Sequence, residues 1–452
     1  MKMKKIMASF LALGVMASAF VGCASGGPAT TPAPEQPKKE AGAPKEEKKD
    51  SVEITFWNYP NYTVVDGIPG KYEEEMIAAF NEKHPDIKVN VEMLSFDGGP
   101  EKVNAAIASN SQPDLIYDYP GRIIDYARQG IMAPVDDMDL ANVPETIVGA
   151  SSLDGKAYMY PINTAPFMLG VNKTLVEKAG LVEMLPLDDP ERIWTIDEYT
   201  AFLKAMKEAM PDVSPMGWYS MNTAGDQGTR AFVGHIYGSG VTTPDLTAYT
   251  MNSPEGVKGL DWVINSIKEG LIIPGSEGYK SNDIIDLFLQ EKVVVTPIYS
   301  PVLKKTNESK KVGEWEDILL PLPVAKEGDK PQLEAYIGGI GIFDNGDAAK
   351  VQAAKTFVDF LANDSEWGMK NLISTGGLSV KSNITNVYPD DKEAVFAEKM
   401  VPYLGTYYNA VPGFAEMRTY WFPEVQNATL GNKTAQQAMD DFVAKANETL
   451  KK

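Results

Sequence analysis

Strand and helix patterns alternate along most of the chain after residue 50, and this alternation predicts an α/β fold. Strand patterns cover residues 52–57, 87–91, 114–117, 293–296 and 337–343. Apolar stripes at helical spacing lie between and after them, in residues 72–80, 103–107, 257–267 and 435–446. The chain has 452 residues, which is long for one domain, so we expect two lobes.

Two segments carry sequence signals that are typical of helix starts. Thr195 and Glu198 have the spacing of a capping box, and the flanking Trp194 and Tyr199 predict a hydrophobic staple. Residues 253–255 open another helix, with a serine cap followed by proline at the first helical position.

The N-terminus indicates export. A lysine-rich start precedes an apolar stretch over residues 6–21, which is too short to span a bilayer comfortably and is typical of a signal peptide. Residues 20–23 resemble a bacterial lipobox, so we expect residues 1–22 to be a lipoprotein signal peptide and Cys23 to be lipidated. Residues 23–50 are rich in Pro, Ala, Lys and Glu and predict a disordered tether. The alternative is an ordinary signal peptide followed by a stray cysteine.

Composition excludes several kinds of site. Cys23 is the only cysteine and the chain has two histidines, so we expect no disulfide, no metal site and no cofactor. The formal net charge of -20 disfavours nucleic acid and anionic lipid as partners. We therefore expect the protein to contact the membrane only through the lipid anchor at Cys23, on the extracellular face of the cell membrane.

A series of short passages, taken in order, resembles one known family. They are residues 80–89, 113–116, 126–134, 154–161, 161–172, 178–181, 374–380 and 420–422. On these passages the chain resembles the family 1 extracellular solute-binding proteins, the sugar-binding lipoproteins of ABC transporters that include the maltose-binding-protein-like group. The resemblance implies a two-lobed periplasmic-binding-protein-like fold with an interlobe cleft and a crossing-strand hinge. It places residues 51–163 and 332–380 in lobe I, and residues 164–331 and 381–452 in lobe II.

A cleft that holds a sugar needs aromatic faces for the ring C–H groups and polar side chains for the hydroxyls. Such residues are expected beyond the ends of strands. The candidates are Trp57, Asn58, Asp97, Asp118, Tyr119, Trp218, Tyr219, Tyr299, Tyr336, Gly338, Gly339, Arg418 and Trp421. Gly338 and Gly339 are included because a missing side chain lets a ligand approach the backbone. The alternatives are core packing for each aromatic residue, a turn cap for Asp97 and a surface ion pair for Arg418.

The resemblance implies a monomeric capture subunit of an ABC importer, which binds a sugar, an oligosaccharide in particular, by lobe closure and delivers it to the transmembrane permease subunits. It implies no catalytic residues and no enzyme activity. Three alternatives stay open: a secreted carbohydrate-active enzyme, a binding protein for a polyamine or ferric ion, and a receptor that serves a membrane sensor. The adjacent Tyr407 and Tyr408 are the reason for considering ferric ion.

Overall fold

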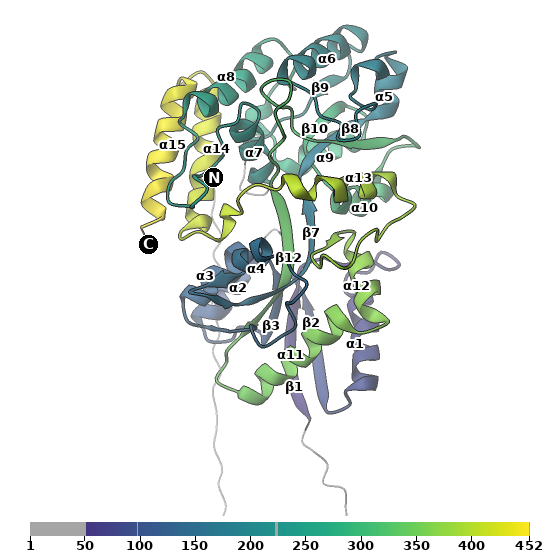
Figure 1. Ribbon diagram of the computed structural model, residues 1–452, viewed down its shortest axis with the longest axis vertical. Helices are drawn as coiled ribbons and strands as arrows, with labels where there is room; N and C mark the ends of the chain where they lie inside the picture. Colours follow the sequence, from purple (N-terminus) through teal and green to yellow (C-terminus); the bar gives the residue numbers. More distant parts are fainter. Residues whose placement is uncertain (1–50, 97, 222–224, 452) are drawn as a thin grey trace, which may run out of the picture. The chain divides into compact units, whose positions relative to one another are not determined.

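The computed structural model describes residues 51–96, 98–221 and 225–451, which contain two large β-sheets with helices around them (Figure 1). The α/β class is therefore confirmed. The signal peptide (1–22), Cys23, the tether (23–50) and Asp97 lie outside the described residues.

The first sheet has seven strands and contains both parallel and antiparallel pairs. Its strands follow the order β13 (Leu378–Ser379), β7 (Met159–Pro166), β12 (Ala335–Phe343), β3 (Leu115–Asp118), β1 (Val52–Asn58) and β2 (Ile87–Met93), with β4 (Met132–Ala133) paired to β12. Strand β1 is parallel to β2 and β3, whereas β12 runs antiparallel to β3 and β7. Asp118 at the end of β3 pairs with Gly339 in the middle of β12, so the first residues of β12 extend beyond the end of β3.

Six helices accompany this sheet, and we call the whole group lobe I. They are α1 (Lys71–Lys83), α2 (Gly99–Ala108), α3 (Pro120–Arg128), α4 (Glu145–Ala150), α11 (Ala348–Asn363) and α12 (Trp367–Thr375). Successive residues of a strand point to opposite faces, so Phe56 and Tyr117 join the core with α1 and α11. Trp57 and Ile116 join a separate core on the other face, which contains residues of α2, α3 and α4.

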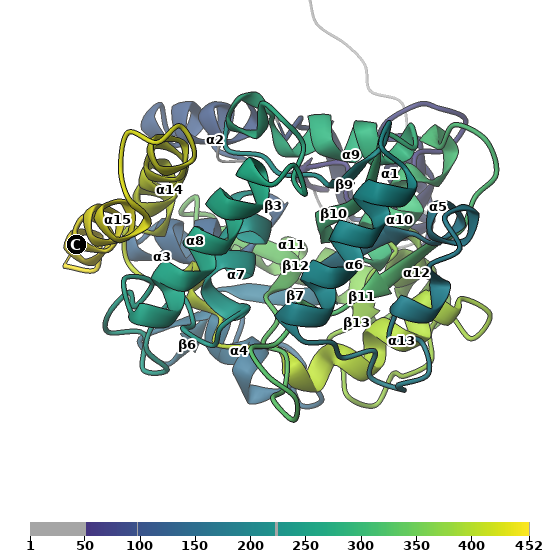
Figure 2. The same ribbon diagram turned by 90° about the horizontal axis from the view of Figure 1, so that it is seen from above.

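The second sheet and its helices form lobe II. Its strands lie in the order β11 (Asp317–Leu320), β8 (Met168–Asn172), β10 (Val293–Tyr299) and β9 (Ser214–Met216). Its helices are α5 (Lys173–Lys178), α6 (Ile196–Ala209), α7 (Asp226–His235), α8 (Pro254–Lys268), α9 (Ser281–Leu289), α10 (Pro301–Asn307), α13 (Lys392–Met400), α14 (Phe414–Thr429) and α15 (Ala435–Thr449). Figure 2 shows α14 and α15 side by side, and they pack on each other.

Short elements complete the structure. They are the hairpin β5 (Ser152–Leu153) and β6 (Lys156–Ala157), and the 3₁₀ turns η1 (Val182–Met184), η2 (Ser276–Gly278), η3 (Glu308–Lys310), η4 (Val401–Tyr403) and η5 (Tyr408–Ala410). Asp154 and Gly155, which join β5 to β6, both have positive φ, as a two-residue hairpin turn requires. None of the described helices combines the length and hydropathy that crossing a lipid bilayer requires.

The predicted helix starts are confirmed. Thr195 and Glu198 form the capping box of α6, and the rings of Trp194 and Tyr199 lie 4.8 Å apart, as a staple requires. The Ser253 side chain caps α8, with Pro254 at its first position.

The chain passes between the two sheets three times. Strand β7 ends in the first sheet at Pro166 and β8 begins in the second at Met168, with Phe167 between them. The second connection spans residues 321–334, between β11 and β12, and the third spans residues 380–391, between β13 and α13. The described residues form one compact unit, and the lobe boundaries are a proposal based on the family resemblance.

Candidate functional site

A half-buried aromatic corner lies where β3 ends and β12 begins. Tyr119 follows the last residue of β3 and starts α3, while Tyr336 is the second residue of β12. Because these strands are antiparallel, the two rings meet edge to face, with centroids 5.2 Å apart. The structure thus brings two of the predicted aromatic residues together.

The carboxylate of Asp118 orients a guanidinium against this corner. Arg122 donates from Nε to Oδ2 of Asp118 at 2.7 Å and also pairs through Nη2. The backbone N–H of Tyr119 donates to Oδ1 of Asp118 at 2.8 Å. The Arg122 guanidinium lies 4.9 Å from the Tyr119 ring centroid and 5.3 Å from that of Tyr59. Lobe I therefore offers two phenol rings and a fixed guanidinium in one place.

Lobe II contributes an ion-paired arginine network. Asp226 is buried at the start of α7, and both Arg230 and Arg418 bind its carboxylate. Nη2 of Arg418 lies 2.7 Å from Oδ1 of Asp226. Burial alone would raise the pKa of Asp226, but the charges of Arg418 and Arg230 outweigh burial and hold that pKa below its usual value.

Electrostatics connects the two lobes at Tyr119. Burial is the main cause that raises the pKa of Tyr119 to about 12; Asp118 raises it further, while the charges of Arg122 and Arg418 oppose the rise. Arg122 belongs to lobe I and Arg418 to lobe II. Tyr119 therefore lies within the fields of guanidinium groups from both lobes.

The lobes also pack closely beside this point. A Cβ atom on Gly121 of α3 would lie 2.4 Å from the carbonyl oxygen of Asn409 and 3.0 Å from the ring of Phe414. Arg128 donates from Nη2 to the carbonyl oxygen of Ala410 at 2.5 Å. Glycine at position 121 thus allows α3 to touch η5 and α14.

Four predicted aromatic residues lie elsewhere, in the core of lobe II. Trp218, Tyr219, Tyr299 and Trp421 are fully buried there. The indole N–H of Trp421 donates to Oγ1 of Thr229 at 3.0 Å, and its ring packs on Phe442 with centroids 5.2 Å apart. Their burial favours the core-packing alternative for these four residues, and we leave them out of the proposed site.

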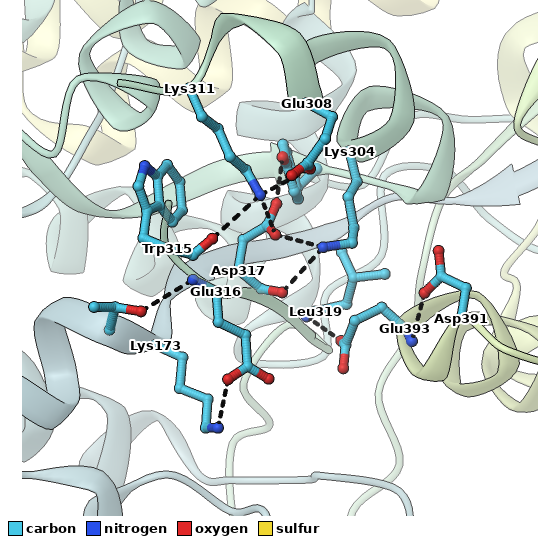
Figure 3. Close-up of polar contacts among 12 residues, drawn as sticks. Lys173, Lys304, Glu308, Lys311, Trp315, Glu316, Asp317, Leu319, Asp391 and Glu393 are labelled. Carbon is cyan, nitrogen blue, oxygen red and sulfur yellow. Dashed lines mark hydrogen bonds and ion pairs between the residues drawn. The ribbon is translucent and has the colours of Figure 1, made fainter. Parts of the chain in front are cut away.

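Tyr299 is held by a polar cluster around β11 instead of facing a cleft. Its hydroxyl donates to Oδ2 of the buried Asp317 at 2.7 Å. Figure 3 shows Lys304 and Lys311 converging on the same carboxylate, and Lys311 Nζ lies 2.8 Å from Oδ1. The hydroxyl therefore satisfies an internal charge cluster.

Trp57 and Asn58, at the end of β1, also contact other side chains of the protein. Trp57 is 9% exposed, and Nζ of Lys102 lies 4.9 Å from its ring centroid. Asn58 is fully buried and donates from Nδ2 to Oε1 of Glu73 at 2.7 Å. Asn58 reaches the corner only indirectly, since it accepts from Nδ2 of Asn61 at 3.3 Å and the Tyr336 hydroxyl donates to Oδ1 of Asn61 at 3.4 Å, so both stay outside the proposed site.

Gly338 and Gly339 make room for protein atoms and not for a ligand, contrary to the reason that selected them. A Cβ atom on Gly338 would lie 2.3 Å from the Tyr336 hydroxyl and 2.4 Å from Oδ1 of Asn163. On Gly339 it would lie 2.4 Å from the carbonyl oxygen of Tyr160. Gly338 nevertheless shapes the site, because it lets the Tyr336 ring fold back over β12.

Sequence reasoning missed Arg122, Asp226 and Arg230. Arg122 has a local signal, since it stands four residues after Asp118 on a helix that proline starts. Asp226 and Arg230 have the same four-residue spacing, but no local signal indicates the pairing of Asp226 with Arg418, which is 192 residues away. Tyr408, once considered for ferric ion, is buried and binds Arg230 and Glu334.

Comparison with known proteins identifies the family. The model for the bacterial extracellular solute-binding protein family matches residues 66–366. The chain belongs to this family. Extracellular solute-binding proteins are binding proteins that capture a solute outside the cell, and lobes I and II with their connections are this family's fold.

Sequence relatives cover most of both chains. A protein of Brucella abortus (strain 2308), named only as a binding protein, is 25% identical over 392 residues, which are 85% of this chain and 90% of that protein. The arabinooligosaccharide-binding protein of Bacillus subtilis (strain 168) is 24% identical over 395 residues, 83% of this chain and 80% of that one.

Solved structures show the same fold. An ABC substrate-binding protein from Listeria monocytogenes in complex with cycloalternan has a TM-score of 0.70 and 22% identity, and the match covers 89% of this chain and all of that one. An ABC transporter solute-binding protein from Thermotoga lettingae bound with alpha-D-tagatose has a TM-score of 0.72 and 21% identity, with 88% of this chain and all of that one covered.

Proposed function

We propose that this solute-binding protein is the substrate-capture subunit of an ABC importer. It binds a sugar, an oligosaccharide in particular, between its lobes and delivers it to a membrane permease. The support is family membership together with the arabinooligosaccharide named for a relative and the cycloalternan and tagatose bound in similar structures.

The observation that carries the proposal is the Tyr119–Tyr336 corner of lobe I, which Arg122 flanks and which lies within the field of Arg418 from lobe II. Tyr119 and Tyr336 offer rigid apolar faces for the C–H groups of a sugar ring. Asp118, Arg122 and Arg418 offer charge-assisted hydrogen bonds for its hydroxyls. A ligand that touches both sides gains contacts only when the lobes close on it, and it therefore favours closure.

Family membership favours binding over hydrolysis, because the matching family is one of binding proteins. Beside the Tyr119–Tyr336 corner, Asp118 is paired with Arg122 and Asp226 with Arg230 and Arg418. We propose that the protein has no enzyme activity and releases its sugar unchanged.

The anchor and the assembly complete the proposal. Cleavage after residue 22 and lipidation of Cys23 would attach the protein to the extracellular face of the membrane, with residues 23–50 as the tether. We propose a monomer with lobe I at 51–163 and 332–380 and lobe II at 164–331 and 381–452, working with transmembrane permease subunits.

A thermal-shift screen against mono- and oligosaccharides tests the function. A sugar present at 100 times its dissociation constant adds about 2.7 kcal/mol to the free energy of unfolding. We expect at least one sugar to raise the melting temperature and to be recovered intact after incubation. A cleaved sugar would indicate an enzyme, and stabilisation only by polyamines or ferric ion would contradict the sugar proposal.

A further inference from the structure

One short stretch, where the second connection enters β12, binds the first connection and the segment between α13 and α14. The backbone N–H of Phe167, in the first connection, donates to the carbonyl oxygen of Glu334 at 2.8 Å. The backbone N–H of Leu333 donates to the carbonyl oxygen of Tyr403 at 2.9 Å, and the carbonyl oxygen of Leu333 accepts from the N–H of Gly405 at 2.8 Å. Tyr403 and Gly405 both lie in the segment before α14. We call residues 333–335 the hinge node. A rotation of one lobe against the other must change its surroundings.

Helix α7 of lobe II also holds the hinge node. Nε2 of Gln227 donates to the carbonyl oxygen of Ala335 at 3.3 Å. The segment that contains Tyr403 and Gly405 continues into η5, which packs on α3 of lobe I. The node is therefore in contact with segments that touch both lobes.

A carboxyl group is buried at the centre of this node. Glu334 is 5% exposed, and the Tyr408 hydroxyl donates to its Oε1 at 2.7 Å. Nε2 of His235 lies 3.8 Å from the same oxygen. The other oxygen, Oε2, is buried with no hydrogen-bond partner among the described residues. An ionised carboxylate with an unsatisfied oxygen is costly in such surroundings, whereas a neutral carboxyl costs less.

The groups facing Glu334 come from three segments. Helix α7 contributes Asp226, Arg230 and His235, the segment that leads into η5 contributes Tyr407 and Tyr408, and the residues after β9 contribute Tyr219. Burial raises the pKa of Glu334 to about 7, and the charge of Arg230, the Tyr408 hydroxyl and the Gln227 side chain only partly oppose the rise. Burial lowers the pKa of His235 to about 4, so this imidazole stays neutral at neutral pH.

We propose that Glu334 is a proton-dependent switch on the lobe arrangement of this protein. The protonated side chain stabilises the arrangement described here, and the ionised side chain favours a rotated arrangement in which water reaches the carboxylate. The switch would regulate access to the proposed site, and to that extent it rests on the proposed function.

The direction of the pH dependence follows from the pKa of Glu334 in each arrangement. An exposed glutamic acid has a pKa near 4.5, so between pH 4.5 and pH 7 the proton binds preferentially to the arrangement that buries Glu334. This preference is lost as the pH rises through 7. Within the window, the ratio of the two arrangements changes by up to about tenfold per pH unit.

Small-angle X-ray scattering of the unliganded full chain from pH 4.5 to pH 8.5 tests the switch. We expect the radius of gyration to change between pH 4.5 and pH 7 in the natural protein, to level off above pH 7, and to stay at its low-pH value in Glu334→Gln. Glu424→Gln is the matched control, because Glu424 is 2% exposed but binds Lys433 and Lys445 between α14 and α15. This control should keep the natural pH dependence.

Infrared difference spectroscopy over the same range detects the proton itself. We expect a protonated carboxyl band that disappears over the same pH interval in which the radius changes and is missing in Glu334→Gln. Tyr408→Phe should move both midpoints to higher pH, because it removes a hydrogen bond that stabilises the carboxylate. A radius that stays constant while the band titrates, an absent band, or an unmoved midpoint in Tyr408→Phe would each overturn the switch. No sugar is used, so a failure of the proposed function leaves this test intact.

Discussion

Asp226→Ala should lower the free energy of unfolding by about 3–5 kcal/mol, because it removes the shared partner of two guanidinium groups. Asp226 is 1% exposed and Arg230 is fully buried. Nη2 of Arg230 already has no partner among the described residues, so the loss of Asp226 would leave its charge without a carboxylate contact. An uncompensated buried charge is among the costliest defects a core can hold.

Urea unfolding followed by circular dichroism measures this loss from the midpoint at constant slope. Glu448→Gln is the control, since it breaks an ion pair with Lys451 in which both side chains are more than two-thirds exposed. Exposed pairs contribute little, so we expect a change below about 0.5 kcal/mol there. A loss below 1 kcal/mol in Asp226→Ala would mean that the arginines find other partners, and would contradict the shared-carboxylate interpretation.

Trp421→Ala should cost about 3–5 kcal/mol of folding free energy, the usual range for emptying a buried tryptophan site. The side chain is fully buried and loses both its contact with Phe442 and its hydrogen bond to Thr229. A place for Trp421 in the sugar-binding cleft would predict the opposite pattern, an intact fold that no longer responds to sugar. We expect a loss of stability instead because the Trp421 side chain is buried in the core of lobe II.

Thermal unfolding with and without the best ligand of the screen separates the two patterns. Trp421→Phe keeps an aromatic ring and loses only the hydrogen bond and part of the volume, so its loss should be clearly smaller. We expect Trp421→Ala to melt at a lower temperature and still to be stabilised by the sugar. An unchanged melting temperature combined with a lost ligand response would restore Trp421 to the binding site.

Much of the fold could be predicted because its signals are local. The capping box at Thr195 and the serine cap at Ser253 fix helix starts within four residues of sequence. The period-two pattern in β1 separates Phe56 from Trp57 on opposite faces of the sheet. Family passages then supplied the two-lobed arrangement, which no local pattern contains.

The site was harder to predict, because a position at the end of a strand does not say where the side chain points. Tyr119 and Tyr299 both stand at strand ends, yet one joins the interlobe corner and the other binds the buried Asp317. On α14, Arg418 reaches Asp226 while Trp421, three residues later, lies in the core. Which face of α14 turns toward lobe I depends on tertiary packing.

Isothermal titration of the sugar identified by the screen into Tyr119→Ala tests the central claim most directly. Tyr237→Ala is the matched control, because this half-buried tyrosine also has a cation over its ring, Lys258 at 4.0 Å, but belongs to lobe II beside α8. We expect one sugar per chain in the natural protein and the control. Tyr119→Ala should bind at least about 30-fold more weakly, the loss of a residue worth about 2 kcal/mol. A folded Tyr119→Ala that binds the sugar as tightly as the natural protein would contradict the claim that the solute is held at the Tyr119–Tyr336 corner.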